Sequence, residues 1–198
     1  DPELMLTVPP HLTAFQGMDA FFHAAEGYLA NIANRASDSY ALDTIGLVAK
    51  WLPIAVADGS NLDARTALAW ANTSAGIVES LSCCISHHSL EHAISAHHPE
   101  LPHGAGLTMT SIAYFTKLAE KAPERFPAMA RAMGEDVDAL PEAERPDAFI
   151  TALRKLIAAI GQAELNLASY GISADEADVI ARNSMDTMAG LYALDPAE

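Results

Sequence analysis

Two pairs of side chains in this chain have the types and the spacing that bind a divalent cation. His88 and His92 are four residues apart, and so are Asp19 and His23. On an α-helix, residues four apart project from the same face, with their Cβ atoms about 6 Å apart. Imidazole and carboxylate groups are common ligands of zinc and iron. Each pair is therefore a candidate metal clamp, provided that a helix carries it.

The surroundings of both pairs also allow an interpretation without metal. Asp19 and His23 lie in the otherwise apolar segment GMDAFFHAAEGY, where their burial costs free energy unless something satisfies them. A hydrogen bond between the two side chains would do so as well as a cation. Six of the eight histidines fall within residues 86–104, and histidines also cluster at exposed helix ends without binding anything. The presence of two such pairs in one helical chain favours metal.

The histidine-rich segment matches a second metal pattern. Residues 88–92 read H-x-x-E-H, the inverted zinc-protease pattern, in which two histidines bind zinc and the glutamate, here Glu91, is the general base. Glu164 is available downstream as a third ligand. A metal-dependent hydrolase is therefore an alternative, although proteases of that kind contain β-sheet.

The remaining candidate ligands have simpler interpretations. Cys84 lies four residues before His88, but a buried and inert helix cysteine is the simpler expectation. The other histidines are expected to be solvated or to lie behind the ligands; these are His11, His87, His97 and His98.

The elements that must position these residues are predicted to be helices. From Thr13 onward nearly every segment has the 3.6-residue apolar spacing of a helix. Helices are expected within residues 13–33, 37–59, 61–98, 103–122, 123–133, 147–165 and 173–191. Gly76 is a candidate break in the longest of them, and Ser173 with Glu176 forms a capping box at the start of the last. The fold class is all-α, a multi-helix array.

The first residues have a different pattern. Residues 1–12 are predicted to be extended, because apolar residues alternate there and run into Pro9 and Pro10, which cannot continue a helix or a central strand. We therefore expect one all-helical domain over residues 1–198, with 1–12 as an extended connector.

Composition limits the partners and the compartment. The net charge of −15 disfavours nucleic acid and anionic membrane surfaces. The longest apolar stretch, around TIGLVAKWLPIAVA, is interpreted as too short to cross a membrane. Cys83 and Cys84 are adjacent, which is unusual for a structural disulfide, and no leader segment is evident. These features predict a cytoplasmic protein. No glycine-rich dinucleotide or P-loop motif occurs.

Two long motifs resemble one family. VPPHLTAFQGMDAFFHAAEGY and HSLEHAISAHHPELPHGAGL are similar to the family patterns LPPxLTAxxGMDAxxHAxEGY and HxLEHAxSAxxxxPHGxGL. These patterns are those of the iron-containing (group III) alcohol dehydrogenases. The motifs lie within residues 1–30 and 86–107, in the order and at about the separation typical of the family. The resemblance implies the dehydroquinate synthase-like architecture, in which an N-terminal α/β domain binds the nicotinamide dinucleotide and a helical C-terminal domain holds the metal. The chain resembles the second domain, with the N-terminal domain absent.

The resemblance also implies roles for individual residues. The metal ligands would be Asp19, His23, His88 and His103. His92 would face the nicotinamide and substrate and help to relay the alcohol proton. Glu26 and Glu91 would be structural or lie behind the ligands. The residues that line the nicotinamide side would be Leu4, Thr7, Val8 and Leu12.

One departure from the family pattern leaves a ligand open. His88 and His103 are 15 positions apart, one more than is usual in the family. His87 would compete with His88 if the extra residue lay within the helix.

The function implied is reversible hydride transfer between a small alcohol or aldehyde and NAD(P), with Fe²⁺ or Zn²⁺ polarising the oxygen. NAD(P) would be bound mainly by the absent domain, so the isolated chain is expected to be inactive. The full-length protein would be a homodimer or larger homo-oligomer. Two alternatives remain: a metal-binding helical module that catalyses nothing alone, and a zinc- or iron-dependent hydrolase that uses residues 88–92. The sequence does not identify the alcohol, the native metal, or NAD against NADP.

Overall fold

The described part of the chain, residues 1–188 of this computed structural model, contains α-helices and short 3-10 helices and no β-strand. The all-α prediction is confirmed. The α-helices are α1 (Pro10–Leu29), α2 (Arg35–Ala57), α3 (Leu62–Ser82), α4 (Ser86–His97), α5 (His103–Lys121), α6 (Phe126–Ala132), α7 (Asp147–Ala159) and α8 (Ala177–Met188). The 3-10 helices are η1 (Pro2–Met5), η2 (Pro123–Arg125), η3 (Val137–Ala139), η4 (Glu142–Glu144), η5 (Leu167–Tyr170) and η6 (Ala174–Glu176). The predicted last helix reached residue 191, and its final residues lie outside the described part.

The prediction of an extended connector over residues 1–12 is wrong. Residues 2–5 form η1, whose first turn is capped by the Asp1 carboxylate accepting from the Glu3 amide at 3.0 Å. Helix α1 begins at Pro10. Proline suits the first turn of a helix because its missing N–H has no intrahelical partner there. The two prolines therefore start α1, where the sequence interpretation had them end an extended segment.

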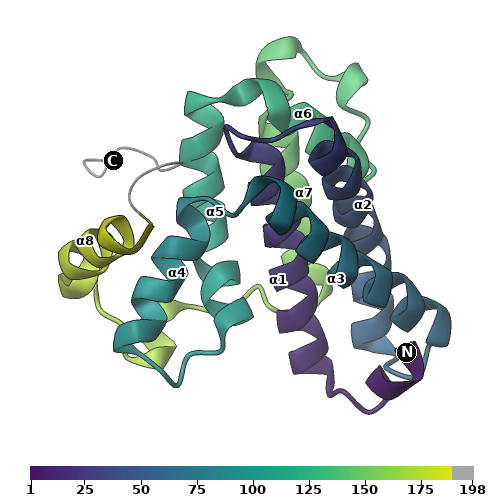
Figure 1. Ribbon diagram of the computed structural model, residues 1–198, viewed down its shortest axis with the longest axis horizontal. Helices are drawn as coiled ribbons and strands as arrows, with labels where there is room; N and C mark the ends of the chain where they lie inside the picture. The colour runs from purple at the N-terminus through teal and green to yellow at the C-terminus, as the bar shows by residue number, and fades with distance from the viewer. Residues whose placement is uncertain (189–198) are drawn as a thin grey trace.

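Helices α1, α2 and α3 lie side by side on one half of the molecule, and α4, α5 and α8 on the other (Figure 1). Among the described residues α2 alone is long and apolar enough to cross a membrane, by length and composition only. The apolar stretch is thus longer than predicted. The buried stripe of α2, which includes Ala41, Ile45, Val48 and Leu52, belongs to the main core of the domain.

Aromatic rings fill the core between the two halves. Phe22 of α1 stacks on Phe115 of α5 at a centroid separation of 5.8 Å, and Phe21 stacks on Phe149 of α7 at 6.1 Å. All four rings are fully buried. Because α1 contributes rings to both stacks, it is the central helix of the domain.

The break in the predicted 61–98 helix occurs at Cys83, seven residues after Gly76. Helix α3 runs through Gly76 and ends at Ser82. Cys83 then has φ 76° and ψ 158°, a conformation that L-residues rarely adopt. This turn lets Ser86 begin α4 in a new direction. Cys83 and Cys84 are both free thiols.

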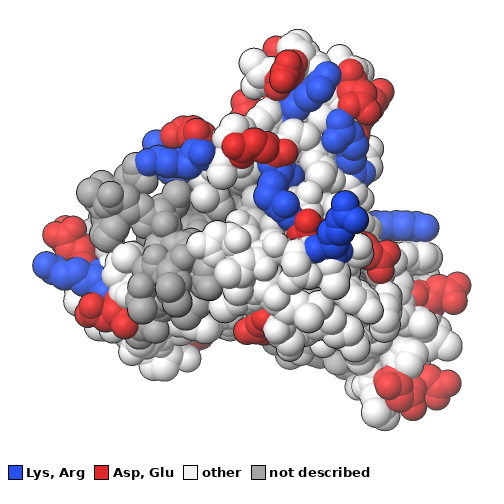
Figure 2. All heavy atoms as spheres, turned by 45° about the horizontal axis from the view of Figure 1, so that its top comes forward, with Lys and Arg blue, Asp and Glu red and all other residues white. Residues whose placement is uncertain are grey.

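The C-terminal described helix covers the outer side of α4. The predicted capping box is confirmed, since Ser173 and Glu176 bond each other's backbone amides at the start of η6, which α8 follows. Behind it, Ile172 and Ile180 pack with Ile94 in a small second core. On the face shown in Figure 2, acidic and basic side chains are interspersed around a large uncharged area.

Candidate metal centre

Three imidazole rings converge on one carboxylate oxygen of Asp19. The Oδ1 atom of Asp19 lies 3.4 Å from His23 Nε2, 3.3 Å from His88 Nε2 and 3.2 Å from His103 Nε2. Asp19 and His23 come from the middle of α1, His88 from the first turn of α4, and His103 is the first residue of α5. The structure thus brings together all four residues that the resemblance implies as metal ligands.

A close approach of two helices makes this convergence feasible. Gly104 stands directly after His103, and a Cβ atom at that position would collide with the Phe15 backbone of α1. The absence of a side chain lets the N-terminus of α5 lie against α1. His103 can therefore reach Asp19 across the helix interface.

Glu26 holds α4 and its histidines from behind. Its side chain is fully buried, and its Oε2 accepts from the amides of Ile85 at 2.9 Å and His88 at 3.2 Å. Its Oε1 lies 2.5 Å from His88 Nδ1 and 3.1 Å from His87 Nδ1. A carboxylate on the Nδ1 side orients a ring so that its Nε2 faces the opposite way, here toward Asp19.

Glu91 orients the ring of His103 in the same way as Glu26 orients the ring of His88. It is fully buried, its Oε2 is bonded to His103 Nδ1, and its Oε1 accepts from Ser95 Oγ at 2.6 Å. Both oxygens are therefore engaged within the protein. Glu91 is not placed to activate a water molecule, which argues against the hydrolase interpretation of residues 88–92.

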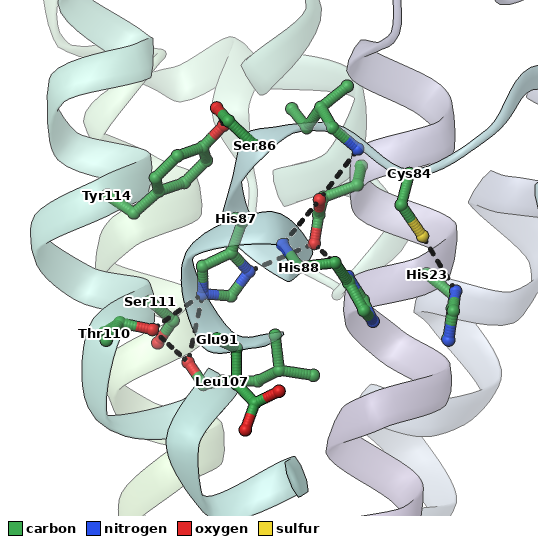
Figure 3. Close-up of polar contacts among 12 residues, drawn as sticks. His23, Cys84, Ser86, His87, His88, Glu91, Leu107, Thr110, Ser111 and Tyr114 are labelled. Atoms are coloured by element: carbon green, nitrogen blue, oxygen red, sulfur yellow. Dashed lines mark hydrogen bonds and ion pairs between the residues drawn. The ribbon is translucent and has the colours of Figure 1, made fainter. Parts of the chain in front are cut away.

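His87 lies on the other side of α4 from the ligand cluster (Figure 3). Its ring is fully buried between Phe22, at a centroid distance of 4.9 Å, and Tyr114, also at 4.9 Å. Its Nε2 lies 3.1 Å from the Leu107 carbonyl oxygen. Of the two expectations for His87, the solvated one is wrong, whereas its contact with Glu26 places it behind the ligand cluster. The geometry favours His88 as the residue that faces Asp19.

His23 has two further neighbours that the sequence reading did not connect with it. Cys84 Sγ lies 3.0 Å from His23 Nδ1 (Figure 3), and Glu79 Oε2 lies 3.4 Å from the same atom. Burial raises the pKa of the Cys84 thiol to about 12. Cys84 is thus a buried, protonated thiol; its burial is as expected, but it lies in the turn between α3 and α4 and not in a helix. Glu79 is separated from His23 by 56 positions, so no local pattern pointed to it.

The carboxylates of the cluster stabilise positive charge on the neighbouring groups. Burial alone would raise the pKa of Glu26, but the charge of His88 and the hydrogen bonds from His87 and His88 lower it to about 2. Burial would lower the pKa of His103, but its hydrogen bonds to Asp19 and Glu91 raise it to about 9. His103 therefore retains its proton at neutral pH, at a position where a bound cation would displace it.

The other predicted site residues are more exposed. His92 is exposed on α4, with its ring 5.3 Å from that of His103 between centroids. Leu4 and Thr7 are exposed, and Leu12, in the first turn of α1, is 39% exposed. Val8 is half-buried, and its carbonyl oxygen accepts from Arg65 at 3.0 Å. Of the other histidines expected to be solvated or to lie behind the ligands, His11 and His97 are exposed, whereas His98 pairs with Glu176 at 2.7 Å.

A cleft opens beside the cluster. It has a volume of about 400 Å³ and lies between α1, α3 and η1. Asp19 contributes to its wall together with Gln16 of α1 and Asn72 of α3. Asp19 is the one member of the cluster among the residues that line this cleft.

Comparison with known proteins shows which protein family the chain is similar to. The profile of the Fe-containing alcohol dehydrogenase family, C-terminal, matches residues 13–196. The chain is 32% identical over 188 residues to NAD-dependent methanol dehydrogenase of Bacillus methanolicus, covering 94% of the chain and 48% of that protein. It is 37% identical over 163 residues to 1,3-propanediol dehydrogenase of Citrobacter freundii, covering 81% and 41%. A crystal structure of 1,3-propanediol oxidoreductase superposes with a TM-score of 0.90 at 31% identity, covering 94% and 48%.

This chain belongs to the iron-containing alcohol dehydrogenase family, as its two motifs predicted. It spans about half the length of the relatives that it matches.

Proposed function

We propose that the chain is the metal-binding half of an NAD(P)-dependent alcohol dehydrogenase. Asp19, His23, His88 and His103 hold a divalent cation, Fe²⁺ or Zn²⁺, and a small alcohol or aldehyde binds in the adjoining cleft. NAD(P) is bound mainly by a nucleotide-binding domain outside this chain. The complete enzyme is cytoplasmic and forms homodimers or larger assemblies.

The convergence of three Nε2 atoms on one Asp19 oxygen is the observation that carries this proposal. One carboxylate and three imidazoles are a donor set that suits either metal. Each Nδ1 atom faces a group behind it: Glu26 for His88, Glu91 for His103, and Cys84 with Glu79 for His23. Partners on Nδ1 are what a histidine needs in order to present Nε2 to a cation.

The protein's own residues would carry the remaining chemistry. When bound, the cation supplies a Lewis acid that polarises the alcohol or carbonyl oxygen. Phe15 and the neighbouring α1 side chains keep the cluster packed against α5. The pKa of His92 is lowered, first by burial and then by the charge of His103. A neutral imidazole at this exposed edge can accept the alcohol proton and release it to solvent.

The metal content of purified chains tests the ligand set. We expect near-stoichiometric iron or zinc in the wild-type chain by elemental mass spectrometry, and its loss in His103→Ala. His92→Ala and the exposed control His97→Ala should retain the metal. His92 separates the two metal interpretations, because the inverted protease pattern requires it as a ligand. Loss of metal in His92→Ala with retention in His103→Ala would refute the proposed ligands.

A further inference from the structure

A second set of metal ligands surrounds the Nδ1 atom of His23, whose Nε2 atom faces Asp19. Cys84 Sγ lies 3.0 Å from this Nδ1 atom (Figure 3), and Glu79 Oε2 lies 3.4 Å from it. One ligand atom each of Cys84, His23 and His88 lie within 4.8 Å of one another. Thiol, imidazole and carboxylate groups are the ligands that zinc takes in proteins. We call Cys84, His23, His88 and Glu79 the thiol site, and the ligand set around Asp19 the Asp19 site.

The atoms of the thiol site fit a tetrahedral cation after small side-chain rotations. Bonds of about 2.3 Å to sulfur and about 2.1 Å to nitrogen or oxygen place neighbouring ligand atoms about 3.4 to 3.6 Å apart. The Glu79 carboxylate is already at this distance from His23 Nδ1, and the Cys84 sulfur is slightly closer. The Glu79 side chain is 51% exposed, so its carboxylate is free to turn toward the sulfur and a cation can enter from solvent.

The thiol site and the Asp19 site exclude each other because they share His23. A neutral imidazole has a hydrogen on one ring nitrogen and a free lone pair on the other. In the Asp19 site, Nε2 of His23 binds the cation and Nδ1 keeps the hydrogen. In the thiol site, Nδ1 binds the cation, and Nε2 keeps the hydrogen and faces Asp19 Oδ1 at 3.4 Å. The tautomer of His23 therefore decides which site holds a cation, and His88, which belongs to both sets, adds to the competition.

The two sites differ in the cations that they favour. A thiolate is a soft ligand and selects soft cations, whereas carboxylate and imidazole groups also suit Fe²⁺. Binding at the thiol site breaks the S–H bond of Cys84 and forms a sulfur–metal bond, and the proton leaves to solvent. Zn²⁺ and the softer Cd²⁺ therefore suit the thiol site better than Fe²⁺ does.

We propose that Cys84, His23, His88 and Glu79 form a second, inhibitory cation site for thiophilic divalent ions, whose occupation excludes a cation from the Asp19 site. Cation binding at the thiol site stands on its own. Its inhibitory effect rests on the proposed function, because there the Asp19 site holds the catalytic cation. An excess of zinc or cadmium would thus inactivate the enzyme by taking His23 away from the Asp19 site.

Titration of the metal-free chain with Cd²⁺ tests the thiol site. A thiolate bound to Cd²⁺ gives an ultraviolet charge-transfer absorption that nitrogen and oxygen ligands do not give. We expect this absorption to saturate near one Cd²⁺ per chain in the wild type and to be lost in Cys84→Ser. Glu79→Gln, an exposed change, should keep the absorption and weaken Cd²⁺ binding by about tenfold or more.

Cys83→Ser is the matched control, because it removes the neighbouring free thiol and leaves Cys84 in place. It should leave the absorption and the affinity unchanged. An absorption that survives in Cys84→Ser and is lost in Cys83→Ser would overturn the proposal, since Cd²⁺ would then bind the wrong thiol. An affinity that is unchanged in Glu79→Gln would remove Glu79 from the ligand set.

Competition between two cations tests the exclusion. The chain is first loaded with Co²⁺, and the visible absorption of cobalt is followed as Cd²⁺ is added. In the wild type we expect the cobalt absorption to fall as the sulfur–cadmium absorption rises, and in Cys84→Ser we expect cobalt to persist to a Cd²⁺ concentration about tenfold higher or more. Loss of cobalt at the same Cd²⁺ concentration in both chains would overturn the exclusion, and so would a sulfur–cadmium absorption that rises while cobalt stays bound. If the wild type bound no Co²⁺, the proposed function would fail, whereas the titration with Cd²⁺ alone would still decide the thiol site.

Discussion

Helix α1 buries two kinds of side chain by opposite means. Phe21 and Phe22 enter a core of aromatic rings, here the aromatic side, whereas Asp19 and Glu26 enter a cluster of histidines, here the polar side. Apolar burial is favourable by itself and is roughly proportional to the area removed from water. Burial of carboxylates is unfavourable unless hydrogen bonds and opposite charge compensate it.

The aromatic side is therefore stable by itself, whereas the polar side depends on a bound ligand. The aromatic side is stabilised by side chains of this chain and needs no bound ligand. The polar side combines carboxylates with imidazoles and contains no lysine or arginine, so it is completed by protons or by a cation. His87 lies at the boundary, because it packs on Phe22 and also bonds to Glu26.

The largest expected effect is on the aromatic side. Phe149→Ala removes a fully buried ring that contacts Phe21, Phe115 and Phe126 and none of the cluster histidines. We expect the free energy of unfolding to fall by about 3–5 kcal/mol. Urea unfolding with and without saturating zinc should give the same loss. A loss that changed by more than about 1 kcal/mol with zinc would show that the aromatic and polar sides are energetically coupled.

The aromatic side is also the part that the sequence predicts best. Its helices follow from the 3.6-residue spacing of apolar residues, and Ser173 with Glu176 correctly predicts the start of the last helical segment. The sequence predictions are wrong where the local backbone conformation determines the start or the end of a helix. Pro9 and Pro10 suit a helix start as well as an extended segment, and α3 breaks at Cys83 because of a positive φ that no propensity foretells. Gly76, the expected break, lies within a continuous helix.

The cluster could be predicted only in part. Spacing groups Asp19 with His23 along one helix, but it also groups His88 with His92, and the structure turns His103 rather than His92 toward Asp19. The convergence of α1, α4 and α5 is a tertiary contact between residues up to 84 positions apart, so it became visible through the family motifs and not through periodicity. Glu79 belongs to no motif. Only the packing of α3 on α1 reveals its position beside His23.

The next effect in size tests the layer behind the ligands. Glu26→Gln keeps the shape of the side chain but leaves one acceptor oxygen instead of two. Either the backbone amides of Ile85 and His88 or the Nδ1 atoms of His87 and His88 therefore face an amide nitrogen that cannot accept. We expect a loss of about 2 kcal/mol in the free energy of unfolding, because buried donors are left without an acceptor. Metal affinity, measured by competition with a chelator, should fall about 10- to 100-fold. The exposed Glu164→Gln serves as control and should change neither quantity.

Glu26→Gln and Phe149→Ala should differ in their effect on metal affinity. The aromatic substitution lowers stability and leaves metal affinity intact, whereas the polar one lowers both. If Glu26→Gln reduced stability without affecting the metal, Glu26 would be a structural brace for α4 alone.

The smallest expected effect is on the turn at Cys83, between α3 and α4. Cys83 connects α3, which packs in the main core, to α4, which carries His88. Its φ of 76° and ψ of 158° lie in a region that is essentially restricted to glycine. Cys83→Gly should therefore relieve strain, and we expect a gain of about 1 kcal/mol after the greater unfolded-state entropy of glycine is allowed for. Cys83→Ser keeps the Cβ atom and should change stability by less than about 0.5 kcal/mol. Equal effects of glycine and serine in thermal unfolding would mean that the turn is not strained.

A gain with glycine, together with unchanged metal content, would show that the strain at Cys83 directs the chain into α4 and does not position the metal ligands.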